Sequence, residues 1–212
     1  MKALYFDTET TGLRTDGFLL DGTVYPGKIC QLAYIIDEDG VLTPKNYYFA
    51  VDAIEPGASR VTGLTVPIVR ALSEGRVFAD YADEIWQDFA VADVLVAHNL
   101  AFDERFLEVE FRRVGISFEV GDKGFCTMRR FAPVLKLRGR GAFYKMPSLE
   151  ELAAFYGVTM ADIMDMLRRL FHVEKDAHDA RHDIVKMYLA LDSACRGDMR
   201  LAAAFSKLPS NR

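Results

Sequence analysis

Apolar residues form three short runs near the start of the chain. The runs are residues 2–9 (KALYFDTE), 29–36 (ICQLAYII) and 46–51 (NYYFAV), and their length and their aromatic and β-branched content are typical of strands. The sequence DEDG at residues 37–40 lies between the second and third runs and predicts a turn. We therefore expect three strands in quick succession, of which the last two form a hairpin, as the antiparallel beginning of a sheet.

The rest of the chain alternates between helical patterns and short strands. Residues 94–98 (VLVAH) predict a short buried strand, and a further short element is expected near Phe125. Ser148, followed three residues later by Glu151, forms a capping-box pattern that marks a helix start. Apolar positions at helical spacing predict helices at residues 78–90, 101–115, 148–156 and 179–195. This order predicts an α/β protein with a mixed central sheet, strands one to three antiparallel, flanked by helices.

Composition and charge limit the classes of protein that fit. The 212 residues suit a single domain, and 50% hydrophobic with 27% charged residues is typical of a folded globular chain. The net charge of -5 gives the whole molecule no attraction for nucleic acid or for an anionic membrane. A polyanionic ligand must therefore be held locally, by a basic patch or by bound metal.

The cysteines and the N-terminal sequence predict a cytoplasmic protein without a membrane partner. Cys30, Cys126 and Cys195 are odd in number and widely spaced, which argues against a disulfide framework or a zinc site and fits a reducing compartment. The first ten residues, MKALYFDTET, reach an acid too early for a signal peptide. No apolar run approaches the roughly 20 residues that a membrane-spanning helix needs.

Two acids end the first predicted strand. Because side chains alternate along a strand, Asp7 and Glu9 face one way, while Leu4, Phe6 and Thr8 face the other. Neighbouring carboxylates repel each other unless a positive charge lies between them, and hard oxygen ligands suit Mg²⁺ or Mn²⁺. The alternative is a solvated loop edge that carries two incidental acids, and this pattern alone favours neither interpretation.

A third acid, Asp103, follows the buried strand at residues 94–98. It lies in the first turn of a predicted helix, where the helix dipole also tolerates an ordinary, non-catalytic anion. His98 and Asn99 precede it, and they have the same simple alternative, as polar residues at the end of a strand.

The sequence DAHDARHD holds the last candidates. His178 and Asp183 are five residues apart, about 140° around a helix axis, so they would not share one helix face. With Asp179 as the N-cap of the last helix, His178 lies in the preceding loop and can still lean toward Asp183. The alternatives are a solvated helix-end histidine and an exposed polar aspartate.

Three motifs in this order resemble a known family. FDTETTGL, VAHNLAFD and HDARHD are similar to the motifs of the DEDDh (DnaQ-like) 3′→5′ exonucleases, which belong to the RNase H-like superfamily. Each motif is modest alone, but the ordered set is highly specific. The resemblance covers about residues 2–195. It implies an RNase H-like exonuclease domain at residues 1–195 and a C-terminal tail at residues 196–212.

The resemblance also implies roles for single residues. The metal-binding acids would be Asp7, Glu9, Asp103 and Asp183. His178 matches the histidine that defines the h subclass, and it would complete the catalytic set as a general base. The positions that match the substrate contacts of the family are Thr10, Gly12, Leu13, His98, Asn99 and Phe102. One departure is Thr62, where the family often has a histidine, and it affects only detail on the substrate side.

The implied activity is that of a metal-dependent 3′→5′ exonuclease of the proofreading or repair type. It would use two Mg²⁺ or Mn²⁺ ions to hydrolyse single-stranded nucleic acid, with DNA favoured, and would release nucleoside 5′-monophosphates. Its partners would be the 3′ ends of single-stranded DNA or RNA, and a DNA polymerase if the chain is a proofreading subunit. The alternatives are an exoribonuclease of the RNase T or oligoribonuclease type and a catalytically silent nucleic-acid-binding module.

Phosphatases of the haloacid-dehalogenase type are a different enzyme class with a similar first motif. In that class Asp7 would be a covalent nucleophile and the second acid of the motif would be an aspartate. Glu9 and the later motif HNLAFD both speak against it.

A basic segment separates the second and third motifs. No acid occurs between Asp122 and Glu150, and this stretch holds seven cations, Lys123, Arg129, Arg130, Lys136, Arg138, Arg140 and Lys145. Aromatic residues are interleaved with them at Phe125, Phe131, Phe143 and Tyr144. Cations that follow a phosphate backbone, with rings for base stacking, are typical of single-strand binding. The alternative is a solvated loop in which Phe131 and Phe143 belong to the core.

Overall fold

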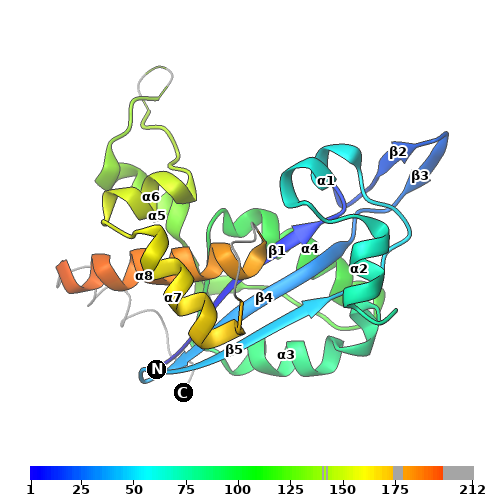
Figure 1. Ribbon diagram of the computed structural model, residues 1–212, viewed down its shortest axis with the longest axis horizontal. Coiled ribbons are helices and arrows are strands. Elements are labelled where there is room, and N and C mark those ends of the chain that lie inside the picture. Colours follow the sequence, from blue (N-terminus) through cyan, green and yellow to red (C-terminus); the bar gives the residue numbers. More distant parts are fainter. Residues whose placement is uncertain (140, 142, 174–178, 198–212) are drawn as a thin grey trace.

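A five-stranded mixed sheet forms the centre of the protein. The computed structural model describes residues 1–139, 141, 143–173 and 179–197. The strand order is β5 (Val41–Tyr48), β4 (Ile29–Glu38), β1 (Lys2–Thr10), β6 (Val94–Ala97) and β7 (Gly124–Cys126). β1 and β5 each pair antiparallel with β4, whereas β6 is parallel to both β1 and β7 (Figure 1). The predicted α/β class and the antiparallel pairing of the first three predicted strands are confirmed.

Helices account for most of the remaining described residues. They are α1 (Pro56–Thr62), α2 (Val66–Leu72), α3 (Ala82–Val91), α4 (Leu100–Arg113), α5 (Thr127–Leu135), α6 (Leu149–Phe155), α7 (Met160–Phe171) and α8 (Ala180–Gly197), with 3₁₀ turns η1 (Phe78–Asp80) and η2 (Gly121–Lys123). The four predicted helices correspond to η1 with α3, to α4, to α6 and to α8. In the described part of the chain, no helix is long and apolar enough to cross a membrane.

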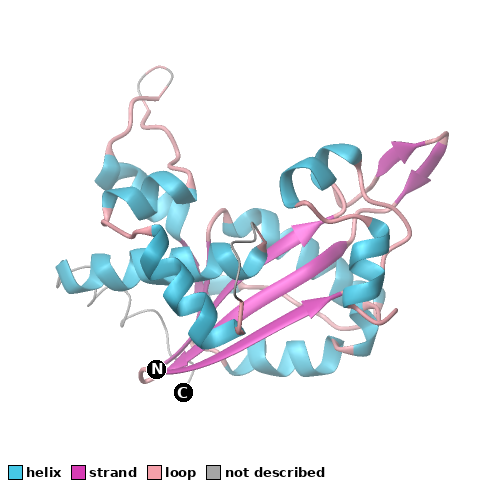
Figure 2. Cartoon of the chain, in the orientation of Figure 1, coloured by secondary structure: helices cyan, strands magenta, loops and turns pink. Residues whose placement is uncertain are grey.

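Helices lie on both faces of the sheet (Figure 2). The alternation along β1 determines which layer each side chain meets. Ala3 and Tyr5 belong to a buried cluster that includes apolar residues of α6, α7 and α8. Leu4 and Phe6 belong to a second buried cluster, with residues of α3 and α4. Because apolar side chains are buried on both faces, β1 is fixed at the centre of the molecule.

The third strand differs from the predicted range of residues 46–51. β5 begins at Val41, directly after the turn, and ends at Tyr48. Pro44 obscured its first half, since a proline argues against a central strand. β5 lies at the edge of the sheet, where a missing backbone N–H is tolerated.

The helices outside the four predicted ranges include α5 and α7. Part of the segment interpreted as a basic loop is helix α5, whose Phe131 is fully buried. Helix α7 was not predicted, although its start carries a capping signal: the Thr159 hydroxyl accepts a hydrogen bond from Asp162 N at 3.2 Å.

A two-stranded hairpin, also not predicted, leaves the sheet directly after β1. Its strands are β2 (Phe18–Leu20) and β3 (Thr23–Tyr25), and it projects beyond α1 (Figure 1). Gly17 allows this departure, because it has a φ of 117° and a Cβ there would lie 2.3 Å from Tyr25 O. The chain then returns to the sheet as β4.

Candidate active site

Asp7 and Glu9 lie in the C-terminal half of β1, on the face that α8 covers. Both side chains are half-buried. In the antiparallel register, Asp7 lies opposite Ala33 and Glu9 lies opposite Gln31 of β4. The strand alternation therefore brings these two acids to the same face, as the sequence predicts.

Asp103 reaches β1 from helix α4. Its Oδ1 accepts hydrogen bonds from the Thr8 hydroxyl at 2.7 Å and from Thr8 N at 3.1 Å. Asp103 is only 2% exposed, and Thr8 is also buried. The residue between the two β1 acids thus ties the third acid to the same strand.

The turn between β6 and α4 sets the position of Asp103. Asn99 has a left-handed conformation, with φ of 68°, and starts the helix directly after the strand. The ring of His98 lies between two other elements: Nδ1 is 2.9 Å from Thr127 Oγ1, and Nε2 is 3.1 Å from Pro147 O. Burial lowers the pKa of His98, so its neutral form is favoured. Both ring nitrogens have partners within the protein, which supports a structural role for this histidine.

Asp183 lies in the first turn of α8, and its side chain is 38% exposed. Its Oδ1 is 3.4 Å from the ammonium group of Lys186, which is only 5% exposed and also donates to Glu150 at 2.9 Å. The neighbouring His182 is fully buried, with Nδ1 3.5 Å from Asp183 Oδ1. His178, the expected general base, lies outside the described residues.

The pKa values of the acids show that their negative charges are close together. Burial, followed by repulsion from Asp103 and Asp183, raises the pKa of Asp7 well above its ordinary value. Burial and repulsion from Asp183 and Asp179 raise the pKa of Glu9 to about 8. Burial raises the pKa of Asp103 to about 7, although its hydrogen bonds from Thr8 oppose the rise. A bound cation would relieve this repulsion.

The side chains do not yet enclose a cation. Among the described residues, no three His, Cys, Asp or Glu side chains are arranged as a ready metal-binding cluster. Two carboxylates have other partners, since Asp103 is bonded to Thr8 and Asp183 to Lys186. The donor set nevertheless fits a hard divalent ion, because it consists of oxygen ligands whose charges repel one another in a buried place.

A cavity of about 330 Å³ opens beside Glu9 of β1. Glu9 and Thr8 form part of its floor, and α1 supplies one wall. Four of the six predicted substrate residues line it, namely Thr10, Gly12, Leu13 and Phe102. His98 and Asn99 do not line this cavity. Its volume is at the lower end of the range of small-ligand pockets.

The sequence interpretation did not single out several residues of this cavity. Glu55 and Val61 line it, and Thr62, noted only as a departure from the family pattern, lines it too. Glu55 packs closely against Gly12, since a Cβ on Gly12 would lie 2.9 Å from its Oε2. The motif Asp-Thr-Glu-Thr-Thr-Gly carries no signal for these contacts, which depend on how α1 packs against the turn after β1.

A comparison with protein-family models matched residues 4–191 to the family described as Exonuclease (RNase_T). The chain belongs to this exonuclease family. The match spans most of the chain, and it confirms the predicted DEDDh-type family and the RNase H-like fold. A search of curated proteins found no match. Family membership makes the protein a nuclease, and exonucleases of this kind typically use divalent metal ions.

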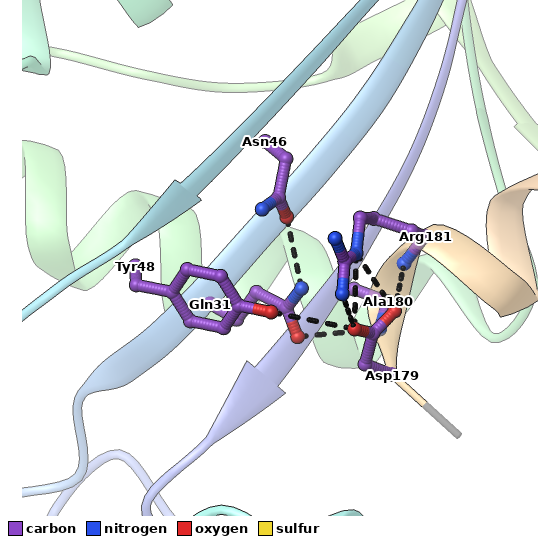
Figure 3. A network of polar contacts seen from close by, with 6 residues as sticks. All are labelled: Gln31, Asn46, Tyr48, Asp179, Ala180 and Arg181. Carbon is purple, nitrogen blue, oxygen red and sulfur yellow. Dashed lines mark hydrogen bonds and ion pairs between the residues drawn. The ribbon is translucent and has the colours of Figure 1, made fainter. Parts of the chain in front are cut away.

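A polar network lies next to the acids of this exonuclease (Figure 3). It joins β4 and β5 to the start of α8, and its members are Gln31, Asn46, Tyr48, Asp179, Ala180 and Arg181. Asp179 is 6% exposed and forms an ion pair with Arg181 at 2.5 Å. The network thus connects the sheet beside Glu9 to the helix that carries Asp183.

The exonuclease also carries an exposed basic arm, which we define as residues 136–139 and 143–147. An isolated bridge pairs Arg138 with Tyr144, and Lys145 N donates to Leu137 O at 3.0 Å. Figure 1 shows this part of the chain projecting from α5 and α6. Phe143 is 83% exposed and Tyr144 is 50% exposed.

The other aromatic residues of the basic segment have a different role. Phe125 and Phe131 are buried in the core, so the core alternative holds for Phe131, whereas the exposure of Phe143 contradicts it there. Arg140 lies outside the described residues.

Proposed function

We propose that this exonuclease removes nucleotides from the 3′ end of single-stranded nucleic acid, with DNA as the favoured substrate, and releases nucleoside 5′-monophosphates. The observation that carries the proposal is the cavity lined by Glu9, which belongs with Asp7 to a cluster of repelling carboxylates. One part of the site attracts cations and the adjoining part can receive a small organic group. This combination suits the terminal nucleotide and the phosphodiester bond that follows it.

The residues that would hold two Mg²⁺ or Mn²⁺ ions are Asp7, Glu9, Asp103 and Asp183. When bound, such ions lower the pKa of a water molecule and offset the negative charge that develops at phosphorus. Asp103 would need little movement of its backbone, since its Oδ1 is already held by Thr8. Asp183 would exchange its contact with Lys186 for the cation, and Lys186 would keep Glu150 as its partner.

The cavity walls would orient the nucleotide. Leu13 and Phe102 offer apolar surface to a base or a sugar, and Thr10 stabilises the turn by donating to Gly12 O at 2.8 Å. Arg105 lies beside Phe102, with its guanidinium carbon 5.7 Å from the centre of the Phe102 ring. Asn99, at the start of the helix that carries Phe102, would also contact the substrate. His178 would accept the proton of the attacking water at a ring nitrogen, because an ordinary histidine pKa is near 6.5.

The arm would hold the strand further from its 3′ end. Its described cations, Lys136, Arg138 and Lys145, can follow the phosphates, and Phe143 and Tyr144 can stack on bases. The base of the arm is connected to the site, because Pro147 O contacts His98 and Lys145 pairs with Glu151 of α6 at 2.6 Å. A strand bound by the arm would therefore lie on a part of the protein that adjoins the acids.

A digestion ladder tests the proposed function. Purified protein is incubated with 5′-labelled single-stranded DNA and with RNA of the same sequence, with Mg²⁺ or Mn²⁺ and with EDTA. We expect products that shorten one nucleotide at a time from the 3′ end, and the released nucleotides to be 5′-monophosphates. The relative rates on DNA and RNA decide between the favoured substrate and the exoribonuclease alternative.

Two variants make the ladder specific. Asp7→Ala should abolish cleavage, whereas Asp165→Ala, which removes an exposed acid on α7, should leave it unchanged. Cleavage that survives both Asp7→Ala and EDTA would contradict the metal-dependent mechanism. Duplex DNA with a matched or a mismatched 3′ end then tests the proofreading role. Adding a DNA polymerase to the same reaction tests whether that partner affects cleavage.

A further inference from the structure

We infer that Gln31 and Asp179 are positioning residues that fix the start of α8, and with it Asp183, against the sheet beside Glu9. The inference rests on the proposed function, because it assigns these two residues to the same reaction. It concerns residues that would touch neither the substrate nor the metal ions.

Gln31 lies in a row of side chains that crosses three strands. In the sheet register it is opposite Glu9 of β1 and opposite Tyr48 of β5. Directly opposed residues on paired strands point to the same face, so all three side chains lie on the α8 face. The network therefore begins beside a proposed metal ligand.

The amide of Gln31 is completely buried and oriented at both ends. Its Nε2 donates to Asn46 Oδ1 at 2.8 Å, and its Oε1 accepts from Ala180 N at 3.3 Å (Figure 3). Ala180 is the first residue of α8, and its backbone N–H has no acceptor within the helix. The sheet thus supplies the acceptor that fixes where the helix begins.

Asp179 satisfies the next donors of the same helix. Its Oδ1 accepts from Arg181 N at 3.0 Å, and its backbone oxygen accepts from His182 N and Asp183 N at 2.9 and 3.2 Å. Its Oδ2 accepts from the Tyr48 hydroxyl at 3.3 Å, which connects the cap to β5. Asp179 therefore acts as an N-cap that is itself attached to the sheet.

Arg181 provides the positive charge that allows Asp179 to be buried close to other acids. Its guanidinium group donates to both oxygens of Asp179, at 3.3 Å to Oδ1 and at 3.0 and 2.5 Å to Oδ2. Without this pairing, a buried Asp179 would add another unpaired negative charge near Glu9. The cap and its counter-ion thus form one unit next to the proposed metal site.

The consequence concerns Asp183 of α8. Asp183 lies one turn after Asp179. The other three proposed metal ligands lie on β1 and α4, so their distance from Asp183 depends on how α8 begins. A shift of about 1 Å in such a group can reduce catalysis by roughly a hundred-fold.

The test compares two helix caps of the same protein. Asp179→Ala and Gln31→Leu remove the contacts described above, whereas Asp179→Asn keeps an oxygen that can cap Arg181 N. Thr159→Ala is the matched control, because it removes the cap of α7, away from the acids. Measured quantities are kcat and KM, the affinity for Mn²⁺ by calorimetry without nucleic acid, the melting temperature, and hydrogen exchange of the Ala180 and Arg181 amides.

We expect Asp179→Ala and Gln31→Leu to reduce kcat by between about ten-fold and a hundred-fold with KM nearly unchanged. Mn²⁺ affinity should fall and exchange at Ala180 and Arg181 should accelerate, and Asp179→Asn should restore part of each. Thr159→Ala should lower the melting temperature without these effects.

Folded Asp179→Ala and Gln31→Leu proteins with normal kcat and Mn²⁺ affinity would overturn the inference. If Asp179→Ala does not fold, Gln31→Leu decides by the same criteria. If the wild-type protein cleaves no nucleic acid, the proposed function fails, while Mn²⁺ affinity and amide exchange still decide whether the network positions α8.

Discussion

The Thr8 hydroxyl donates a 2.7 Å hydrogen bond to Asp103, and so connects the first strand to a helix that begins more than ninety residues later in the sequence. Thr8 N donates to the same carboxylate oxygen at 3.1 Å. Thr8 faces the α4 side of β1, opposite to Asp7 and Glu9. A single threonine thus brings the third acid to the strand that carries the other two.

Replacing Thr8 with valine should loosen this connection while keeping the side-chain volume. A hydrogen bond to a charged group contributes about 1.5–3 kcal/mol, so we expect weaker Mn²⁺ binding and a further rise in the pKa of Asp103. Calorimetric titration with Mn²⁺ measures the first effect. Thr43→Val, on the exposed edge strand, is the matched control. Equal affinities in the two variants would show that Thr8 does not prepare Asp103 for the metal.

The raised pKa values predict how stability without metal depends on pH. The pKa of Glu9 is about 8 and that of Asp103 about 7 in the folded protein, against ordinary values of 4.5 and 3.8. The folded state therefore binds these protons more tightly than the unfolded state, and the free energy of unfolding should fall as pH rises from about 5 to about 8.

Thermal unfolding in EDTA across this pH range measures the slope. We expect Mn²⁺ to offset the loss at high pH, and Glu9→Gln to flatten the slope because this side chain no longer titrates. A slope that is the same in Glu9→Gln and in the wild type would contradict the role of Glu9.

The contribution of Glu150 to stability depends on pH in the opposite direction. Its hydrogen bond from Lys186 lowers its pKa to about 2, against an ordinary value of 4.5. Its contribution to stability is therefore complete above about pH 4.5 and is lost as pH falls toward 2. We expect the difference in urea midpoint between wild type and Glu150→Gln to shrink from pH 7 to pH 3. The effect should be small, because the Glu150 side chain is 71% exposed. A midpoint difference that grows as the pH falls would contradict the lowered pKa of Glu150.

The arm provides a prediction about substrate binding. Phe143→Ala should weaken binding of a long single strand by roughly ten-fold or more, as expected for loss of one stacked base. Phe155→Ala, which removes a 54% exposed ring from α6, should have no such effect. Fluorescence anisotropy in EDTA measures binding without cleavage. The two variants would bind equally if the arm were only a solvated loop.

Charge on the arm can be tested separately through salt. Removing both Lys136 and Arg138 should reduce the slope of log affinity against log salt by about 1.4, since each phosphate contact on a single strand contributes about 0.7. Arg168→Ala with Arg169→Ala, at the end of α7, removes the same charge elsewhere and serves as the control. An equal change of slope in both double variants would assign the effect to net charge alone.

The sequence predicted those parts of the fold that depend on local periodicity. The alternation in KALYFDTE placed Asp7 and Glu9 on one face and Thr8 on the other, and the Ser148–Glu151 capping box placed the start of α6. Errors arose where the local signal was ambiguous. Pro44 concealed the first half of β5, and the cations of α5 suggested a loop although one helical face is buried.

The candidate site was harder to predict from the sequence than the fold. The motifs named its acids, but the contacts of Asp103 with Thr8 and of Lys186 with Glu150 join residues that are far apart in the chain. Glu55 and Val61 reach the cavity only because α1 packs beside β1. Such contacts depend on tertiary packing, for which a single sequence contains no periodic signal. The assignments of all site residues, and the domain boundary at residue 195, remain predictions.

The strand order also affects how the protein can be assembled during synthesis. β1 is synthesised before the helices α4 and α8 that bury it, and Asp183 belongs to the last helix that the structure describes. A nascent chain that has not yet extended through α8 exposes the apolar α8 side of β1 and lacks the fourth acid. If Asp183 is a metal ligand as proposed, we expect fragments that stop before α8 to lack nuclease activity, which would begin only when this helix docks onto β1 and β4.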